Sequence, residues 1–288
     1  MYEIFAKDNI SGPAPERAAA GVLLNDRGEQ EQAGGPGQYP ETADIDTASD
    51  DYASRFAGET GRYFLDVQTG IILDLLRDFA GCSVLDVGGG HAQSAVPLVR
   101  HGYRLTVTGS DDVCRQRLDR FLAPGSFQYR ICDSLHLPFA DNAFDFVLAV
   151  RLLPHVERWP ELLAEMCRVA RRGVILDYPD QRSFNVLYRL LFQAKKALEG
   201  NTRTFTLFSR GQLRRELEKN GFSAPDYRPE FFFPMVLHRK LGRPFLSRTL
   251  EAGARLLGLR RLFGSPIILR SRKRQEGSRQ KPAAGGVD

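Results

Sequence analysis

The stretch Val84-Leu85-Asp86-Val87-Gly88-Gly89-Gly90-His91-Ala92-Gln93 decides the fold of this chain. Its apolar start predicts a buried strand. The three glycines predict a tight turn, because glycine has no Cβ and lets the backbone bend sharply and come close to a ligand. We expect a helix to begin at about residues 91–93, with free N–H groups and a positive dipole end facing the turn. The stretch therefore predicts a strand–loop–helix unit that can bind a nucleotide-like molecule.

Three interpretations of this loop compete. An ordinary strand-to-helix turn needs no ligand. A dinucleotide-binding loop requires Gly-x-Gly-x-x-Gly or Ala directly after the strand. Gly88 and Gly90 fit that pattern, but Gln93 does not. The third interpretation rests on Asp86, because a carboxylate there would repel a pyrophosphate but can accept hydrogen bonds from an ammonium group.

The pattern Asp86-x-Gly88-x-Gly90 resembles motif I of the class I S-adenosylmethionine-dependent methyltransferases. In that family the acidic residue lies near the amino-acid end of the cofactor. Ala92 stands where the family commonly has another glycine. The resemblance implies S-adenosylmethionine as the cofactor, with Asp86, Gly88, Gly89, Gly90 and Ala92 in its site.

An acidic residue also follows the second expected strand, residues 103–109. The carboxyl end of this strand is where a ribose can be held by its two hydroxyls. Asp111 is the candidate for this contact and Asp112 a weaker one. Both are equally able to cap a helix, which aspartate favours.

A third expected strand, residues 127–132, precedes Asp133 and Ser134. The resemblance implies that Asp133 approaches the adenine amino group and that Ser134 adds a backbone N–H.

The segment Leu137 to Val147, L-P-F-A-D-N-A-F-D-F-V, closely resembles a stretch of the small-molecule, type 11-like branch of the family. Glu165 to Gly173 resembles the E-x-x-R-V-L-K-P-G helix and turn of the same family. We expect a fourth strand at residues 146–150 and a fifth at 174–176. The resemblance covers about residues 63–222.

The expected fold is α/β, with a Rossmann-like, mostly parallel seven-stranded sheet, helices on both faces and a C-terminal antiparallel hairpin. The last helix before the hairpin has an N-cap candidate at Ser209 and a stop at Asn220-Gly221. Residues 227–236 and 264–269 are the expected strands of the hairpin. One antiparallel strand on an otherwise parallel sheet is permitted in mixed sheets.

Composition divides the chain into three parts. Residues 1–50 are rich in Gly, Pro, Ala, Glu and Gln, which predicts disorder. Residues 51–270 are expected to form the methyltransferase domain, and residues 271–288 a disordered basic tail. The 288 residues carry a net charge of +5. That value hides an acidic beginning and a basic end.

Several classes of protein are disfavoured by the sequence. No apolar run approaches the roughly 18 residues that span a bilayer, and residues 1–10 lack the apolar core of a secretory signal. The four cysteines have no C-x-x-C spacing and the five histidines do not cluster. These features predict reduced thiols, no metal site and a cytoplasmic location.

Two helical insertions are expected, near residues 181–200 and 237–263. The first is rich in Phe and Leu and is placed to roof the acceptor site. The second mixes apolar residues and arginines in a loosely helical pattern: Phe245, Leu246, Arg248, Leu250, Ala254, Arg255, Leu257, Leu259, Arg260 and Arg261. Such a basic amphipathic segment either contacts a membrane peripherally or packs on the domain with its arginines in solvent.

The acceptor side is expected after the fourth and fifth strands. Arg151 begins a stretch that faces the expected pocket and is included among the cofactor-binding candidates. His155 matches the second histidine of the frequent L-H-H words of the family and is the candidate base or acceptor-orienting residue. Asp177 and Tyr178 are candidates for lining the pocket. Arg62 and Tyr63, in the segment before the first strand, are weaker candidates for touching the cofactor carboxylate.

Two features of the sequence bear on the class of acceptor: one motif that is missing and one aromatic run that is present. The N/D-P-P-Y/F word of nucleic-acid amino methyltransferases does not follow the fourth strand, so nucleic-acid partners are disfavoured. The aromatic run Phe231-Phe232-Phe233 favours an apolar or amphiphilic small molecule, such as a quinone precursor, lipid, polyketide or lipid-linked sugar. A non-catalytic scaffold and an RNA-directed methyltransferase are the alternatives, since the basic end of the chain permits RNA contact by charge.

Overall fold

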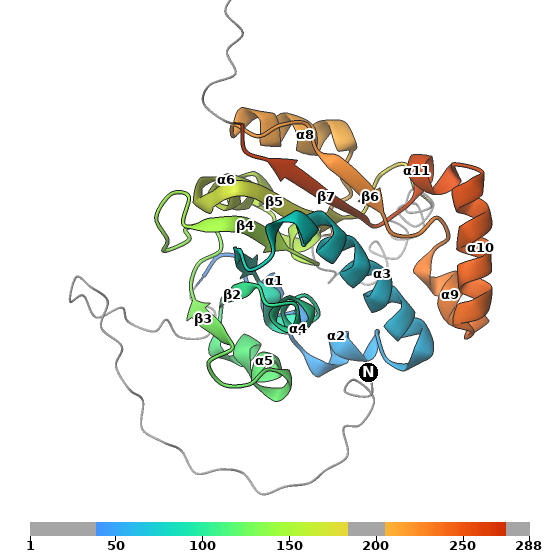
Figure 1. Cartoon of the computed structure of the whole chain (residues 1–288), viewed down its shortest axis with the longest axis horizontal. Helices are drawn as coiled ribbons and strands as arrows, with labels where there is room; N and C mark the ends of the chain where they lie inside the picture. The colour runs from blue at the N-terminus through green and yellow to red at the C-terminus, as the bar shows by residue number, and fades with distance from the viewer. Residues whose placement is uncertain (1–38, 184–204, 275–288) are drawn as a thin grey trace, which may run out of the picture.

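A computed structural model of the chain describes residues 39–183 and 205–274. These residues form one seven-stranded sheet with strand order β3-β2-β1-β4-β5-β7-β6 (Figure 1). Strands β1 to β5 pair in parallel, and β7 pairs antiparallel with both β5 and β6. The strands are β1 (Ser83–Val87), β2 (Arg104–Gly109), β3 (Phe127–Ile131), β4 (Phe144–Ala149), β5 (Ala170–Tyr178), β6 (Asp226–Pro229) and β7 (Ile267–Arg272). The predicted fold class is confirmed.

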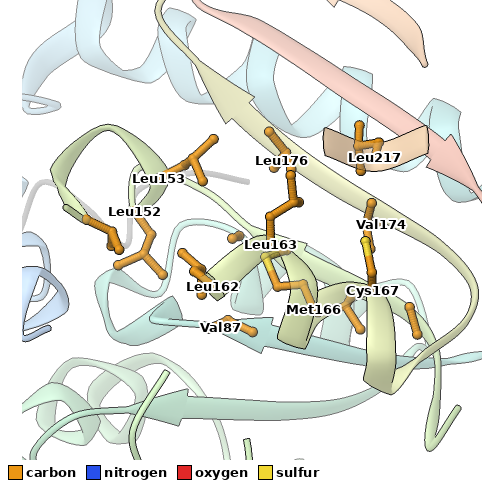
Figure 2. Close-up of a cluster of buried hydrophobic side chains, with 14 of the residues drawn as sticks. Val87, Leu152, Leu153, Leu162, Leu163, Met166, Cys167, Val174, Leu176 and Leu217 are labelled. Atoms are coloured by element: carbon orange, nitrogen blue, oxygen red, sulfur yellow. The ribbon is translucent and has the colours of Figure 1, made fainter. Parts of the chain in front are cut away.

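Helices cover both faces of this sheet, because side chains alternate along each strand. Leu85 and Val87 of β1 point to one face, which packs against α6 and α8. Figure 2 shows this cluster, with Leu163 of α6 beside Leu176 of β5. Val84 points to the other face, against α3, α4 and α5. The helices are α3 (Gly58–Leu76), α4 (Ala95–Arg100), α5 (Gln116–Phe121), α6 (Trp159–Val169) and α8 (Arg210–Lys219).

The ends of α8 agree with the sequence. Ser209 accepts a hydrogen bond from the backbone N–H of Gln212 at 3.2 Å, as an N-cap should. Asn220 is the C-cap, and Gly221 follows in the left-handed region at φ +83°. The chain then turns towards β6.

The expected helix start at residues 91–93 is wrong. The glycine loop first makes a 3-10 turn, Gly89–His91, and α4 begins only at Ala95. Ala92 has φ +62°, which a right-handed helix does not allow. The helix therefore begins after the chain leaves this position.

Order also extends beyond the expected boundaries. Two short helices, α1 (Ala43–Thr47) and α2 (Asp50–Ser54), precede α3, so residues 39–50 are not disordered. The polar composition of α1 does not predict this order, because the helix is held in place by long-range hydrogen bonds of Asp44. Likewise, Ser271 and Arg272 continue β7 and pair with β5. Residues 1–38 and 275–288 lie outside the described part of the chain.

The chain between β6 and β7 is helical. It forms α9 (Met235–Leu241), α10 (Pro244–Leu256) and α11 (Leu259–Phe263), on the right of Figure 1. The other expected insertion, near residues 181–200, falls almost entirely outside the described residues.

The two sequence motifs that resemble the methyltransferase family contact each other in the fold. The carboxylate of Glu165 accepts the backbone N–H of Leu137 at 2.8 Å and pairs with Arg168. Arg168 donates to the carbonyls of Leu137 and Phe139 and to Asp141. The E-x-x-R word of α6 therefore fixes the loop that carries the L-P-F-x-D word.

A second family position joins two strands. Asp145 of β4 accepts hydrogen bonds from the backbone and hydroxyl of Ser83 in β1, and pairs with Arg171 and Arg172. Burial alone would raise the pKa of Asp145, but these bonds outweigh it and hold the pKa well below its usual range. The carboxylate is thus an ionised clamp at the amino ends of β1 and β4.

Within residues 39–183 and 205–274, no helix is long and apolar enough to cross a membrane. The same residues hold no group of three or more His, Cys, Asp or Glu side chains placed to bind a metal ion. All four cysteines are free thiols, and Cys114, Cys132 and Cys167 are buried.

Candidate active site

Most of the predicted site residues lie along one edge of the sheet. Because β1 to β5 are parallel, their carboxyl ends meet at the same edge, where ligands bind in open α/β sheets. Gly88 follows β1, Asp111 follows β2, Asp133 follows β3 and Arg151 follows β4. The fold therefore brings together residues that lie far apart in the sequence.

The glycine loop is tightly held against this edge. The N–H of Gly88 donates to the carbonyl of Thr108 at 3.0 Å, and Gly88 has the left-handed φ of +68° that favours glycine. A Cβ on Gly90 would lie only 2.6 Å from the carbonyl oxygen of Cys114. Even alanine would therefore force the loop to shift at Gly90.

Asp86 lies beneath the loop and is fully buried. A Cβ on Gly89 would collide with its carboxylate, so only glycine fits above it. Within the described part of the chain, neither carboxylate oxygen has a hydrogen-bond partner, and burial raises the pKa of Asp86 to about 8. A buried carboxyl without a partner costs free energy. The group is therefore suited to take up a donor when a polar ligand binds at the loop.

The predicted ribose residue Asp111 caps a short helix in this structure. One of its oxygens accepts the N–H of Val113 at 2.8 Å, and the side chain is half-buried. Asp112 is exposed and begins the 3-10 turn Asp112–Arg115. A carboxylate has about four acceptor positions, so this cap leaves Asp111 able to accept further hydrogen bonds.

Asp133, the predicted adenine contact, is arranged in a similar way. Its Oδ1 accepts a hydrogen bond from the N–H of Leu135, and its Oδ2 lies 2.9 Å from Nδ1 of His136. Ser134 beside it is half-buried. These bonds fix the Asp133 carboxylate at the carboxyl end of β3.

Arg151 is buried in a polar network instead of pointing freely into solvent. Its guanidinium donates to Gln93 at 2.8 Å and to Gln68 at 2.6 Å, and its backbone N–H donates to Asp177 at 2.6 Å. The guanidinium carbon also lies 4.1 Å from the centre of the Phe56 ring. Arg151 has φ +60°, an uncommon conformation for a side chain of this size. The network thus joins the glycine loop to α3 and β5.

This network gives a structural role to Gln93, the residue that does not fit the pattern of a dinucleotide-binding loop. Gln93 uses its side-chain oxygen to hold Arg151, and its backbone N–H donates to Nδ1 of His91. Nε2 of His91 lies 3.2 Å from the carbonyl of Val150. Burial lowers the pKa of His91 to about 3, and nearby Arg151 adds to this effect. His91 is therefore neutral and fastens the loop to β4.

The candidate base lies at the border of the same network. His155 ends the 3-10 turn Leu153–His155, is half-buried, and its ring centre lies 5.7 Å from that of Phe205. Burial raises the pKa of Asp177, while the charges of Arg151 and His155 oppose the shift. His155 and Asp177 are thus close enough to interact electrostatically. Tyr178 differs from the expectation, because it is fully buried in the core cluster against Phe208.

Sequence reasoning missed Glu230, which follows β6 at the same edge of the sheet. It is 1% exposed, and neither of its carboxylate oxygens has a partner among the described residues. Burial raises its pKa to about 8, Arg151 lowers it and Asp177 raises it. A single glutamate before an aromatic run gives no signal in the sequence, because its neighbours come from other strands.

Sequence reasoning also missed Asp44, which places α1 on the glycine loop. Asp44 accepts hydrogen bonds from the backbone N–H and the hydroxyl of Ser110, both at 2.6 Å. A Cβ added to Gly88 would lie 3.3 Å from the Cβ of Asp44, and one added to Gly90 would lie 3.1 Å from that of Ala48. Helix α1 therefore lies over the part of the loop that the resemblance assigns to the cofactor.

A small cavity lies beside this cover. Its volume is about 220 Å³, and it reaches from α2 and α3 to Gln93 of the glycine loop. Phe56, which stacks on Arg151, also lines the cavity. The segment before β1 thus covers the carboxyl edge through Asp44 and Phe56.

The two residues proposed for that role lie elsewhere. Arg62 lines a groove between α3 and α10, together with Arg243 and Arg248. Tyr63 packs against Phe231 and His238. Neither contacts the glycine loop, because the first turns of α3 face α9 and α10.

Comparison with known proteins identifies the domain. Residues 85–176 match a family model described as Methyltransferase domain. This match supports the predicted resemblance to the class I S-adenosylmethionine-dependent methyltransferases over these residues, about a third of the chain. The match begins in β1 and ends in β5, so it contains the glycine loop, Asp111 and Asp133.

Two relatives have similar sequences. Methyltransferase GfsG of Streptomyces halstedii is 29% identical over 143 residues, which are 48% of this chain and 46% of that protein. The demethylmenaquinone methyltransferase of Corynebacterium glutamicum is 28% identical over 177 residues, 55% of this chain and 75% of that protein. The chain thus spans about half the length of the first relative and three quarters of the second.

The fold also matches solved class I methyltransferases. Magnesium protoporphyrin IX methyltransferase from Synechocystis, solved with bound S-adenosylhomocysteine, has a TM-score of 0.55. The alignment covers 80% of this chain and 98% of that chain at 16% identity. At this identity the likeness establishes the fold.

Proposed function

We propose that this methyltransferase transfers a methyl group from S-adenosylmethionine to a small apolar or amphiphilic molecule. The observation that carries the proposal is the carboxyl edge of the sheet. There a glycine loop that accepts no Cβ at Gly90 lies above Asp86, whose carboxyl has no hydrogen-bond partner among the described residues. Asp111 and Asp133 follow the next two strands at the same edge.

The residues of this edge suit each part of the cofactor. Asp86 and the loop Gly88, Gly89, Gly90 and Ala92 would hold the amino-acid part, because a carboxylate and the backbone of a glycine-rich loop complement an ammonium and a carboxylate. Asp111 would accept hydrogen bonds from the ribose hydroxyls, and Asp112 is the weaker candidate for the same contact. Asp133 and the N–H of Ser134 would contact adenine. Arg151 would position the loop through Gln93.

When bound, S-adenosylmethionine supplies a methyl group on a positively charged sulfur, which an acceptor atom takes in line while the carbon–sulfur electron pair returns to sulfur. The protein must align the acceptor and exclude water, which supplies much of the rate in such transfers. Phe56, stacked on Arg151, covers the edge and would exclude water. A hydroxyl acceptor must also lose a proton, and His155 is the proposed base or orienting residue.

The proposed class of acceptor rests on apolar side chains around this edge. Phe56, Tyr63, Phe64, Leu65 and Phe231 form a separate apolar cluster beside the network of Arg151. A similar relative, named demethylmenaquinone methyltransferase, acts on an apolar molecule by its name. A quinone precursor, lipid, polyketide or lipid-linked sugar would fit the chain in the same way.

Calorimetric titration with S-adenosylhomocysteine tests the cofactor part of the proposal. The wild type should bind it, and Gly90→Ala should weaken binding at least about tenfold, equivalent to roughly 1.4 kcal/mol, because the new Cβ meets the carbonyl of Cys114. Gly70→Ala is the matched control, because a Cβ there meets nothing within 4 Å. Thermal melts of both variants would show that they are folded.

The alternatives predict other results of the same titration. Binding of NADH in place of S-adenosylhomocysteine would indicate a dehydrogenase, and binding of neither would favour a scaffold. An RNA-directed enzyme would bind S-adenosylhomocysteine but place its methyl group in RNA. Each of these outcomes would contradict the proposal.

A further inference from the structure

Helix α10 packs with its polar residues inwards. Its buried positions are Ser247, Glu251 and Ala254, which follow one another at helical spacing. The large apolar residues lie on the opposite side, where Phe245 is 76% exposed and Leu256 is 84% exposed. A helix on the surface of a soluble domain normally buries its apolar stripe. In α10 this arrangement is reversed.

The exposed apolar residues of the described chain gather in this region. Eight of the ten large hydrophobic side chains that are exposed in residues 39–183 and 205–274 lie between residues 236 and 263. They are Val236, Phe245, Leu246, Leu250, Leu256, Leu257, Leu262 and Phe263. We call this set the outer apolar face. Exposed apolar side chains gathered on neighbouring helices, here α9, α10 and α11, mark a candidate interaction site.

Positive charge accompanies the outer apolar face. Residues 235–263 contain seven basic residues: Arg239, Lys240, Arg243, Arg248, Arg255, Arg260 and Arg261. Their one acidic residue, Glu251, is buried. The helices therefore present apolar and cationic side chains to the exterior and no exposed carboxylate.

Glu251 fixes this orientation. Its carboxylate accepts the backbone N–H groups of Phe232 and Phe233 and lies 3.1 Å from Nε2 of the buried His238. Turning α10 so that its leucines were buried would break these bonds. It would also leave no apolar side of the helix exposed to a partner. The polar contacts thus hold the outer apolar face outwards on a fixed platform.

The helices also lie at the functional edge of the sheet. Strand β6 runs parallel to β5, because both pair antiparallel with β7. The chain therefore leaves β6 at the carboxyl edge, and it re-enters the sheet at Ile267 opposite Tyr178, where β5 ends. Figure 1 shows α9 and α10 beside the first turns of α3.

We propose that residues 235–263 dock this protein on a lipid bilayer that contains anionic headgroups. The outer apolar face would enter the headgroup boundary, and the surrounding arginines would pair with lipid phosphates. Docking in this way would turn the carboxyl edge of the sheet towards molecules dissolved in the bilayer. The proposal goes beyond methyl transfer and does not require it.

A bilayer fits this surface better than a protein or nucleic-acid partner. Two copies paired through the outer apolar face would bring fourteen basic residues together, since each contributes seven. Nucleic acid would satisfy the arginines but would leave Phe245 and Leu256 in water. An anionic bilayer satisfies both kinds of side chain at once.

Cosedimentation of the full chain with vesicles tests this proposal. The protein should pellet with phosphatidylcholine vesicles containing about one third phosphatidylglycerol, and much less with phosphatidylcholine alone. Leu256→Ser with Leu257→Ser should reduce binding at least about tenfold, and Arg255→Glu with Arg261→Glu should do the same in low salt. All four side chains are exposed, so the fold should survive.

Matched controls lie elsewhere on the surface. Val113→Ser removes an exposed apolar side chain outside the outer apolar face, and Arg100→Glu reverses an exposed charge on α4. Both should bind vesicles as the wild type does. Because the assay needs neither cofactor nor turnover, its outcome is independent of the proposed methyl transfer.

Three results would overturn the proposal. The protein could fail to bind either vesicle, or bind both equally and without regard to the arginine variants. Alternatively, sedimentation velocity could show a dimer that Leu256→Ser with Leu257→Ser dissociates, and the occupant of the face would then be a second copy.

Discussion

At the scale of single residues, the carboxyl edge holds buried carboxyl groups that the rest of the fold does not pair. Asp86 and Glu230 are buried without hydrogen-bond partners in the described part of the chain, and burial raises the pKa of Glu230 although the charge of Arg151 lowers it. Ordinary core packing does not explain such groups, since burying them costs free energy. We infer that these groups find their partners when a polar ligand binds at the edge.

Asp111 gives the first prediction at this scale. Asp111→Ala should weaken the binding of S-adenosylhomocysteine by about 1–3 kcal/mol, the usual cost of losing a charge-assisted hydrogen bond. Calorimetry measures this change. Asp119→Ala, at an exposed position on α5 that pairs with Arg115, should leave the affinity unaltered. Equal affinity of the two variants would remove Asp111 from the site.

Glu230 gives a prediction about pH. Its pKa is about 8 in the fold against a usual 4.5, so between these values the folded chain keeps a proton that the unfolded chain has released. The free energy of unfolding should therefore fall as pH rises from about 5 to 8. Glu230→Gln should raise Tm at pH 8, by about 2–4 °C for each kcal/mol recovered, and change it little at pH 5.

The control for this effect is Glu59→Gln, at an exposed position in the first turn of α3. It should follow the wild type at every pH in a thermal melt. If Glu230→Gln also melts in parallel with the wild type from pH 5 to pH 8, the carboxyl of Glu230 is not buried as described.

At the scale of elements, two features could not be derived from sequence patterns. The composition of residues 1–50 predicts disorder, whereas hydrogen bonds between Asp44 and Ser110 hold helix α1 in place. The pattern of α10 predicts an amphipathic helix but not which side faces the protein. Burial of Glu251 against the backbone of Phe232 decides that question. Periodicity identifies a face, whereas long-range polar contacts determine its direction.

The position of α1 gives a prediction for cofactor binding. Because α1 lies against Gly88 and Gly90, we expect it to move before the cofactor can occupy the loop. Asp44→Ala removes the bonds that hold α1 to Ser110 and should tighten S-adenosylhomocysteine binding by about fivefold, corresponding to roughly 1 kcal/mol. Weaker binding by this variant would mean that α1 stays in place and that Asp44 belongs to the site.

The appropriate control is Asp46→Ala on the same helix. Asp46 is exposed, whereas Asp44 is buried. Its affinity for S-adenosylhomocysteine should equal that of the wild type in the same titration.

Arg168 gives a prediction for stability. It donates to the carbonyls of Leu137 and Phe139 and pairs with Asp141 and Glu165. Arg168→Ala should lower the free energy of unfolding by about 2 kcal/mol, since partly buried acceptors lose a charged donor. Urea denaturation measures the loss. Arg214→Ala, which removes one exposed pair with Glu218, should be nearly neutral.

At the scale of the whole molecule, the sequence was sufficient for the order of elements. The glycine loop, the L-P-F-x-D word and the E-x-x-R word each lie where the family resemblance puts them, and the last two contact each other. The site was only partly predictable. Arg151 turns inwards to Gln68 and Gln93, and Glu230 reaches the edge from β6. Neither arrangement leaves a local pattern, because each depends on strands that are distant in the sequence.

The carboxyl edge, where we propose that the cofactor binds, and the outer apolar face lie at the same end of the sheet. The central claim is that this edge transfers methyl groups to an apolar or amphiphilic acceptor. Its most direct test is incubation of the wild type with S-adenosylmethionine carrying a labelled methyl group and a cell extract, followed by separation of organic and aqueous phases. Gly90→Ala, with its weaker cofactor binding, serves as the control at a cofactor concentration below saturation. We predict label in the organic phase for the wild type and about tenfold less for Gly90→Ala. Label confined to the aqueous phase would contradict the proposed acceptor, and no transfer in either phase would contradict methyl transfer itself.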